Sequence, residues 1–162
     1  MRFNWPVLKC PSLAGFGCPP RRVSRNLELI LHVYVNERGL GEVLNAPVDV
    51  ILDHHTVVVP DLVYVSSGRS SIIEHRAIVG APDLLVEILS PSTADRDWGA
   101  KAKLYARFGV ERYWVVDPDE RTLTTFSRSG DAYLPLARYS GDEIIRSALF
   151  PDLAIDLSKV WG

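Results

Sequence analysis

Apolar residues recur at helical spacing in the first part of the chain, at Leu27, Ile30, Leu31 and Tyr34. This pattern continues until Gly39, and Ser24 is a suitable N-terminal cap for the helix that it predicts. Residues 1–22 differ, because they show neither helical nor strand periodicity and contain four prolines. We therefore expect an irregular N-terminal arm over residues 1–22, followed by a single domain over residues 23–162.

Downstream of this helix the apolar period shortens to two, which is typical of strands. Apolar and more polar residues alternate from Val48 to Asp53, so a strand with one wetter face is predicted there. A second strand is expected over Val57–Val65, where Pro60 indicates an edge position or a bulge. Residues 66–82 are expected to form a loop with one helical turn around Ile72–Glu74.

The segment Asp83-Leu-Leu-Val-Glu-Ile-Leu-Ser90 is an almost continuous apolar run, which favours a strand buried on both faces. A helix is predicted after it, capped by Ser92 or Thr93 and closed near Phe108 by Gly109. The remaining predicted elements are strands at 112–116, 122–127, 133–139 and near Ile144, and a last helix at Asp156–Trp161. This succession, without a repeat, indicates an α/β or α+β fold with a mixed central sheet flanked by helices.

The composition fits one globular domain, since 47% of the 162 residues are hydrophobic and 23% are charged. Lys and Arg number 18 against 20 Asp and Glu, which gives a net charge of −2. The chain therefore lacks the basic excess that drives non-specific nucleic-acid binding, and contact with DNA would need basic residues gathered locally. Arg21, Arg22 and Arg25 form the one such cluster. It is either a solvated arm or, if the arm folds near the site, a contact for phosphate.

The expected location is the cytoplasm, without membrane contact. Cys10 and Cys18 are the only cysteines, and they build neither a disulfide framework nor a zinc site. We interpret them as free thiols in a reducing compartment. No stretch approaches the roughly 20 apolar residues of a membrane span. Lys9 interrupts the short apolar run near the N-terminus, which lacks the layout of a signal peptide.

Glu87 is the most informative residue for function, because it lies in the middle of a predicted buried strand. Burying an unpaired carboxylate is costly, so Glu87 requires a cation, a hydrogen-bond donor or a raised pKa. Asp61, directly after Pro60, is the second candidate. If neighbouring strands bring the two carboxylates together, a metal ion would join them, and oxygen ligands suit magnesium or manganese. The alternative is that Glu87 pairs with an arginine and Asp61 caps a turn.

The predicted helix after this strand offers a third candidate. Asp97, Lys101 and Tyr105 are spaced four residues apart, so they share one helix face. This face is either a solvated one with an ordinary ion pair or one that brings Lys101 back toward Glu87. In the second case the lysine would orient an attacking water or stabilise charge that develops on phosphate.

These residues resemble the Uma-two family (Uma2), a group of bacterial proteins with a restriction-endonuclease-like PD-(D/E)xK core. The segments that carry the resemblance are Pro60-Asp-Leu62, Ala81-Pro-Asp-Leu-Leu-Val-Glu-Ile-Leu-Ser-Pro-Ser-Thr93, Arg96-Asp97, Lys101 and Tyr105-Ala-Arg-Phe-Gly-Val-Glu-Arg-Tyr-Trp-Val-Val-Asp-Pro118. The resemblance extends from about Val23 to Trp161. It implies magnesium-dependent hydrolysis of DNA phosphodiester bonds, with manganese as an alternative ion, and the homodimeric state in which related folds often cut both strands.

The resemblance also implies roles for single residues. Asp61 matches the Asp of the PD motif, and Glu87 matches the acidic residue of (D/E)xK, so both would bind the metal. Leu89 stands where that motif has its lysine. The family's lysine lies on the following helix, which makes Lys101 the match and Lys103 a weaker one. The implied catalytic residues are therefore Asp61, Glu87 and Lys101.

One departure from the family pattern leaves the activity open. Family members usually carry a Tyr-Glu-Leu-Ile-Asp-Gly-like motif near the N-terminus, and this chain lacks it. Residues 1–22 contain no acidic residue, and Glu28 is expected at the edge of the helix's apolar stripe, peripheral to the metal. This predicts an open, weak and manganese-tolerant metal site with little or no nuclease turnover. The alternatives are an inactive relative that acts as a binding or regulatory partner, and an unrelated structural domain in which Glu87 is only ion-paired.

Overall fold

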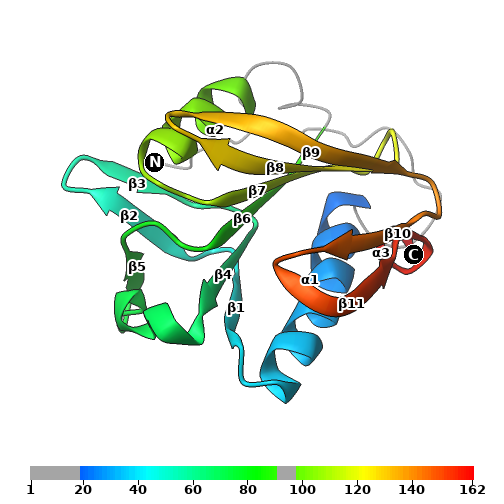
Figure 1. Ribbon diagram of the computed structural model, residues 1–162, viewed down its shortest axis with the longest axis horizontal. Helices are drawn as coiled ribbons and strands as arrows, with labels where there is room; N and C mark the ends of the chain where they lie inside the picture. Colours follow the sequence, from blue (N-terminus) through cyan, green and yellow to red (C-terminus); the bar gives the residue numbers. More distant parts are fainter. Residues whose placement is uncertain (1–18, 91–97) are drawn as a thin grey trace, which may run out of the picture.

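The computed structural model describes residues 19–90 and 98–162 (Figure 1). The predicted arm up to residue 18 with both cysteines, the helix caps Ser92 and Thr93, and Asp97 lie outside the described residues. The elements in chain order are α1 (Pro19–Glu37), β1 (Gly41–Asn45), β2 (Asp49–Asp53), β3 (Thr56–Val58), β4 (Leu62–Ser66), the 3-10 helix η1 (Ser67–Ile72), β5 (Ala77–Val79), β6 (Leu84–Ile88), α2 (Trp98–Arg107), β7 (Arg112–Asp117), β8 (Thr122–Ser129), β9 (Ala132–Ser140), β10 (Ile144–Ser147), β11 (Phe150–Asp156) and α3 (Leu157–Trp161).

A six-stranded mixed sheet organises the molecule, with the strand order β1-β4-β6-β7-β8-β9. Strands β6 and β7 are parallel and are joined through α2, whereas the other neighbours in this sheet are antiparallel. All five residues of β6 are buried, as its continuous apolar sequence predicts. The predicted mixed sheet flanked by helices is confirmed.

The sheet separates two apolar cores. On one face lie α1, α3 and the β10–β11 hairpin (Figure 1), which pack around Trp114, Phe150 and Trp161. On the other face, α2 and the small sheet β3-β2-β5 pack around Tyr105 and Tyr113. Alternate residues of each central strand supply the two cores, so Val86 belongs to the α1 face and Leu85 to the α2 face.

Helix α1 begins at Pro19, earlier than the expected start after Ser24. Proline is tolerated in the first turn because the amide groups there have no partner within the helix. Val23 is 2% exposed and extends the apolar stripe toward the N-terminus, so residues 19–22 of the predicted arm are helical. The helix ends where Gly39 adopts a φ of 61°, and the Leu40 amide donates to the Val35 carbonyl in the manner of a glycine-capped C-terminus.

Several strand predictions need correction. The expected single strand Val57–Val65 is two strands, β3 and β4, which belong to different sheets because the chain leaves one sheet at Val59–Asp61 and enters the other. Strands β1, β5 and β11 were not predicted from the pattern. Both β1 and β5 are short and have one buried residue each, which leaves little periodicity to detect. The last helix is confirmed, with Asp156 as its cap.

Candidate active site

The site is built around Glu87, whose strand β6 lies in the middle of the main sheet. The residue is only 7% exposed. Because side chains alternate along a strand, Glu87 shares the α2 face with Leu85, while Val86 and Ile88 face α1. A carboxylate at this depth must be compensated, and α2 supplies both compensating groups.

Lys101 and Tyr105 of α2 both contact Glu87. Lys101 Nζ lies 3.0 Å from Glu87 Oε2, and Tyr105 donates its hydroxyl hydrogen to Glu87 Oε1 at 2.6 Å. The expected approach of Lys101 to Glu87 is therefore present. Sequence reasoning placed Tyr105 on the same helix face but gave it no role; its spacing of four residues from Lys101 was the available signal.

Asp61 lies on the neighbouring chain segment, directly before β4. The register pairs Leu62 with Val86, so extending it by one residue places Asp61 opposite Glu87. Residues that oppose each other in an antiparallel pair share one face of the sheet. The backbone amide of Ile88 also donates to Asp61 Oδ2 at 2.7 Å, which ties this carboxylate to the end of β6.

Burial changes the acidity of both carboxyl groups. Desolvation raises the pKa of Glu87, and it outweighs the opposing effects of the Tyr105 and Lys101 hydrogen bonds; the charge of Asp61 raises it further. Desolvation likewise raises the pKa of Asp61, against the hydrogen bond from Ile88 and the charge of Lys101. An additional cation bound beside the two carboxylates would favour their ionised forms.

A cavity of about 520 Å³ opens beside Asp61, between the first turns of α1 and the connection from β1 to β2. Its lining residues are Pro20, Arg21, Ser24, Arg25, Glu28, Asn45, Ala46, Pro47 and Asp61. Glu28, which was expected to be peripheral to the metal, lines the same cavity as Asp61. It accepts a hydrogen bond from Asn45 Nδ2 at 2.9 Å.

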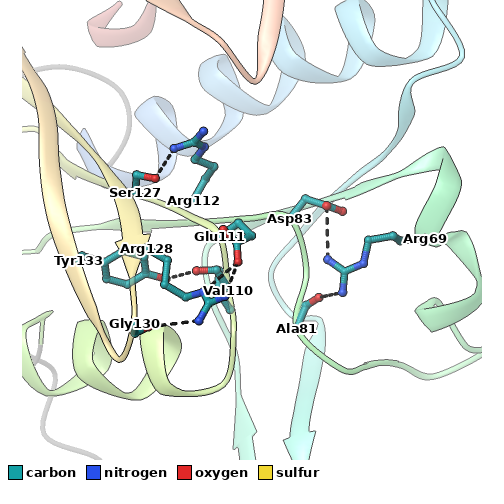
Figure 2. A network of polar contacts seen from close by, with 10 residues as sticks. All are labelled: Arg69, Ala81, Asp83, Val110, Glu111, Arg112, Ser127, Arg128, Gly130 and Tyr133. Carbon is teal, nitrogen blue, oxygen red and sulfur yellow. Dashed lines mark hydrogen bonds and ion pairs between the residues drawn. The ribbon is translucent and has the colours of Figure 1, made fainter.

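A separate polar network lies at the opposite end of β6 (Figure 2). Arg69 of η1 pairs with Asp83 at 3.3 Å and donates to the Ala81 carbonyl. On the adjoining segment Arg128 pairs with Glu111 at 2.7 Å. These ion pairs lie at the beginning of β6 and β7, whereas Glu87 lies near the other end of β6.

A magnesium ion fits the donor set that Asp61 and Glu87 offer. Magnesium keeps several waters and binds through one or two carboxylates together with substrate phosphate. Over residues 19–90 and 98–162, no group of three or more His, Cys, Asp or Glu side chains is arranged to hold a metal ion. The two carboxylates would therefore need water and substrate to complete the coordination.

Comparison with known proteins identifies the family of this chain. The profile of the Uma2 family, described as "Putative restriction endonuclease", matches residues 19–158. This chain belongs to the Uma2 family. The match begins where α1 begins and includes Asp61, Glu87 and Lys101. The resemblance derived from the motifs is confirmed, and membership in Uma2 supports nuclease activity in general.

A solved structure shares the fold. It is described as a putative nuclease belonging to DUF820 from Anabaena variabilis ATCC 29413. The TM-score is 0.73 at 16% identity, and the match covers 91% of this chain and 83% of that one. The Uma2 chain therefore shares the fold of that protein. A search of curated proteins finds no match.

Proposed function

We propose that this Uma2 protein is a metal-dependent endonuclease that hydrolyses phosphodiester bonds of DNA. The observation that carries the proposal is the buried Glu87, which contacts Lys101 and Tyr105 of α2 and lies opposite Asp61. An ion pair alone would explain Lys101. It does not explain why a second carboxylate with a raised pKa stands beside the pair and borders an open cavity.

Each residue has a distinct part in this reaction. Asp61 and Glu87 would hold Mg²⁺, with Mn²⁺ as the alternative ion, and the bound metal would supply Lewis-acid stabilisation of the phosphate and a more acidic water. Lys101 would orient the attacking water and stabilise negative charge at phosphorus. Tyr105 is a positioning residue, because its hydroxyl fixes one oxygen of Glu87 and leaves the other to Lys101.

The setting of the reaction is also part of the proposal. We place the protein in the cytoplasm and expect a homodimer, because a duplex has two strands to cut. Among the described residues, no helix is both long and apolar enough to cross a membrane.

The decisive experiment is cleavage of supercoiled and linear DNA by the full chain with Mg²⁺, with Mn²⁺ and with EDTA. Because the sequence predicts a weak metal site, we expect slow nicking or cutting with either metal and none with EDTA. Asp61→Asn, Glu87→Gln and Lys101→Met should each abolish it while the circular-dichroism spectrum stays folded. Arg138→Ala, an exposed change on β9, should retain it. Activity that survives Glu87→Gln would reject the proposal, and so would a complete lack of cleavage with both metals.

A further inference from the structure

The cavity beside Asp61 contains more than carboxylates. Arg21 and Arg25, one turn apart on α1, both line it and are both exposed. Residues four positions apart lie on one helix face, separated by about 6 Å along the axis. The two guanidinium groups therefore border the same hollow from the same side, next to the carboxylate that the proposed reaction uses.

The side chains of Arg21 and Arg25 form no ion pair that would stabilise the fold, as far as the described residues show. Within the described part of the chain, neither lies within ion-pair distance of a carboxylate; the side-chain contact of Arg25 is a long one of 3.4 Å to Asn26. Arg22, between them, behaves differently. Its Nε is buried, and its side chain lies against Gly162 at the end of α3. One arginine of the sequence cluster thus serves packing and the other two face the cavity.

The surrounding charges limit where an anion can bind. The whole chain has a net charge of −2, so a polyanion gains no general attraction from it. Glu28 lies one turn beyond Arg25 on the same face and is held by Asn45. It would repel phosphate, which confines the anion to the end of the cavity formed by Arg21 and Arg25.

We propose that Arg21 and Arg25 bind backbone phosphate of the DNA strand that is cut, and so position its scissile bond at Asp61. This inference rests on the proposed nuclease function. Guanidinium groups bind phosphate through two parallel hydrogen bonds, which gives orientation as well as attraction. A cavity of about 520 Å³ has the size of a small-ligand site, large enough for one nucleotide unit of a strand. Contacts of this kind position the backbone without reading its sequence.

The test measures binding separately from cleavage. A short fluorescent DNA duplex is titrated with the full chain carrying Glu87→Gln, in EDTA, between about 50 and 200 mM salt. Adding Arg21→Ala and Arg25→Ala to that background should weaken binding about 10-fold, and lower the slope of log affinity against log salt by about 2, since each phosphate contact contributes about 0.9. Lysine at both positions should restore the slope but only part of the affinity.

The double change Arg138→Ala and Arg146→Ala in the same background is the matched control, because it also removes two exposed positive charges, one from β9 and one from β10. It should leave affinity and slope nearly unchanged, and all variants should unfold at the same temperature. A parallel titration with inorganic phosphate distinguishes a strand-binding site from a site for free phosphate.

Each result bears on one proposal or the other. Equal salt slopes with and without the two arginines would overturn the inference, as would no binding of DNA at all, or arginine-dependent binding of phosphate without binding of DNA. Arginine-dependent DNA binding by a parent chain that never cleaves would reject the nuclease proposal and keep the phosphate contact. Cleavage that is unchanged when both arginines are replaced would reject the phosphate contact and keep the nuclease proposal.

Discussion

At the scale of a single residue, the buried position of Glu87 is what identifies the candidate site. Glu87 interrupts a strand in which every other residue is apolar and buried. Apolar neighbours make ionisation of Glu87 costly, and α2 compensates with the ammonium of Lys101 and the hydroxyl of Tyr105. A buried carboxylate lowers the stability of a fold unless it is compensated, so its presence indicates a functional role.

The Tyr105 hydroxyl should make a measurable contribution to stability. Tyr105→Phe removes a 2.6 Å hydrogen bond to a buried carboxylate oxygen, which should cost about 1–2 kcal/mol of unfolding free energy. Because that bond lowers the pKa of Glu87, its loss should raise this pKa further. Urea denaturation measures the first effect. Tyr139→Phe is the control, since its hydroxyl donates to the exposed Arg146 carbonyl, and it should change stability by less than about 0.5 kcal/mol.

The raised pKa values predict a stability that falls with pH in metal-free solution. Glu87 and Asp61 titrate above their ordinary values of 4.5 and 3.8, so across that range the native state binds more protons than the unfolded state. Their contribution is fully present below the ordinary values and is lost as pH rises through the raised ones. Asp53 and Asp156, whose pKa values are lowered, act in the opposite direction.

The comparison of parent chain and Glu87→Gln isolates this effect from that of the other acids. In EDTA, the stability of the variant relative to the parent should improve as pH rises above 4.5, the ordinary pKa of a Glu side chain, as followed by urea denaturation. A difference that stays constant with pH would show that the pKa of Glu87 is the same in the native and unfolded states, which would contradict the prediction.

At the scale of elements, helix α1 has two roles on different sides: one side packs into the apolar core, and another lines the cavity beside Asp61. Leu27 is 0% exposed and Leu29 is 62% exposed, on the same helix. Leu27→Ala should therefore destabilise the protein by about 2–5 kcal/mol. Leu29→Ala, the same chemical change, should stay within about 0.5 kcal/mol. Thermal unfolding of the two variants tests whether α1 is docked as described, and similar losses for both would contradict it.

The sequence predicts elements well where burial is continuous and poorly where it is not. Strands β6 and β7 are predicted correctly because a continuous apolar run is typical of a strand buried on both faces. The run from Val57 to Val65 misleads, since periodicity cannot show that the chain changes sheets at Pro60. Lys101 is predictable because its distance from Glu87 is short along the chain. The nearness of Glu28 to Asp61 is not, because it depends on how the turn at Asn45–Pro47 meets α1.

At the scale of the molecule, the site lies where the two cores meet. Asp61 and Glu87 face the α2 core by register, whereas the cavity beside Asp61 is closed by α1, which belongs to the other core. A change in either helix should therefore reach the site. This arrangement also means that a ligand bound there connects elements from both layers.

Metal binding should increase the free energy of unfolding, because the site joins elements from both layers. At about 100 times its dissociation constant, Mg²⁺ or Mn²⁺ should add about 2.7 kcal/mol to the unfolding free energy of the parent chain. Asp61→Asn should lose most of this gain, while Asp83→Asn, at the other end of β6, should keep it. Thermal unfolding with and without metal gives the answer. An equal gain in parent and Asp61→Asn would place the ion elsewhere.

The crossover from β6 through α2 to β7 has a consequence for synthesis on the ribosome. Glu87 emerges first, and its two partners on α2 follow. Helix α2 contacts β7, with 5.4 Å between the ring centres of Tyr105 and Tyr113, and it also packs against β9. Part of the surface that holds α2 is therefore translated after the helix itself. A nascent chain that ends before β7 carries Asp61, Glu87 and Lys101 but lacks this part of the surface that holds the lysine against the carboxylate.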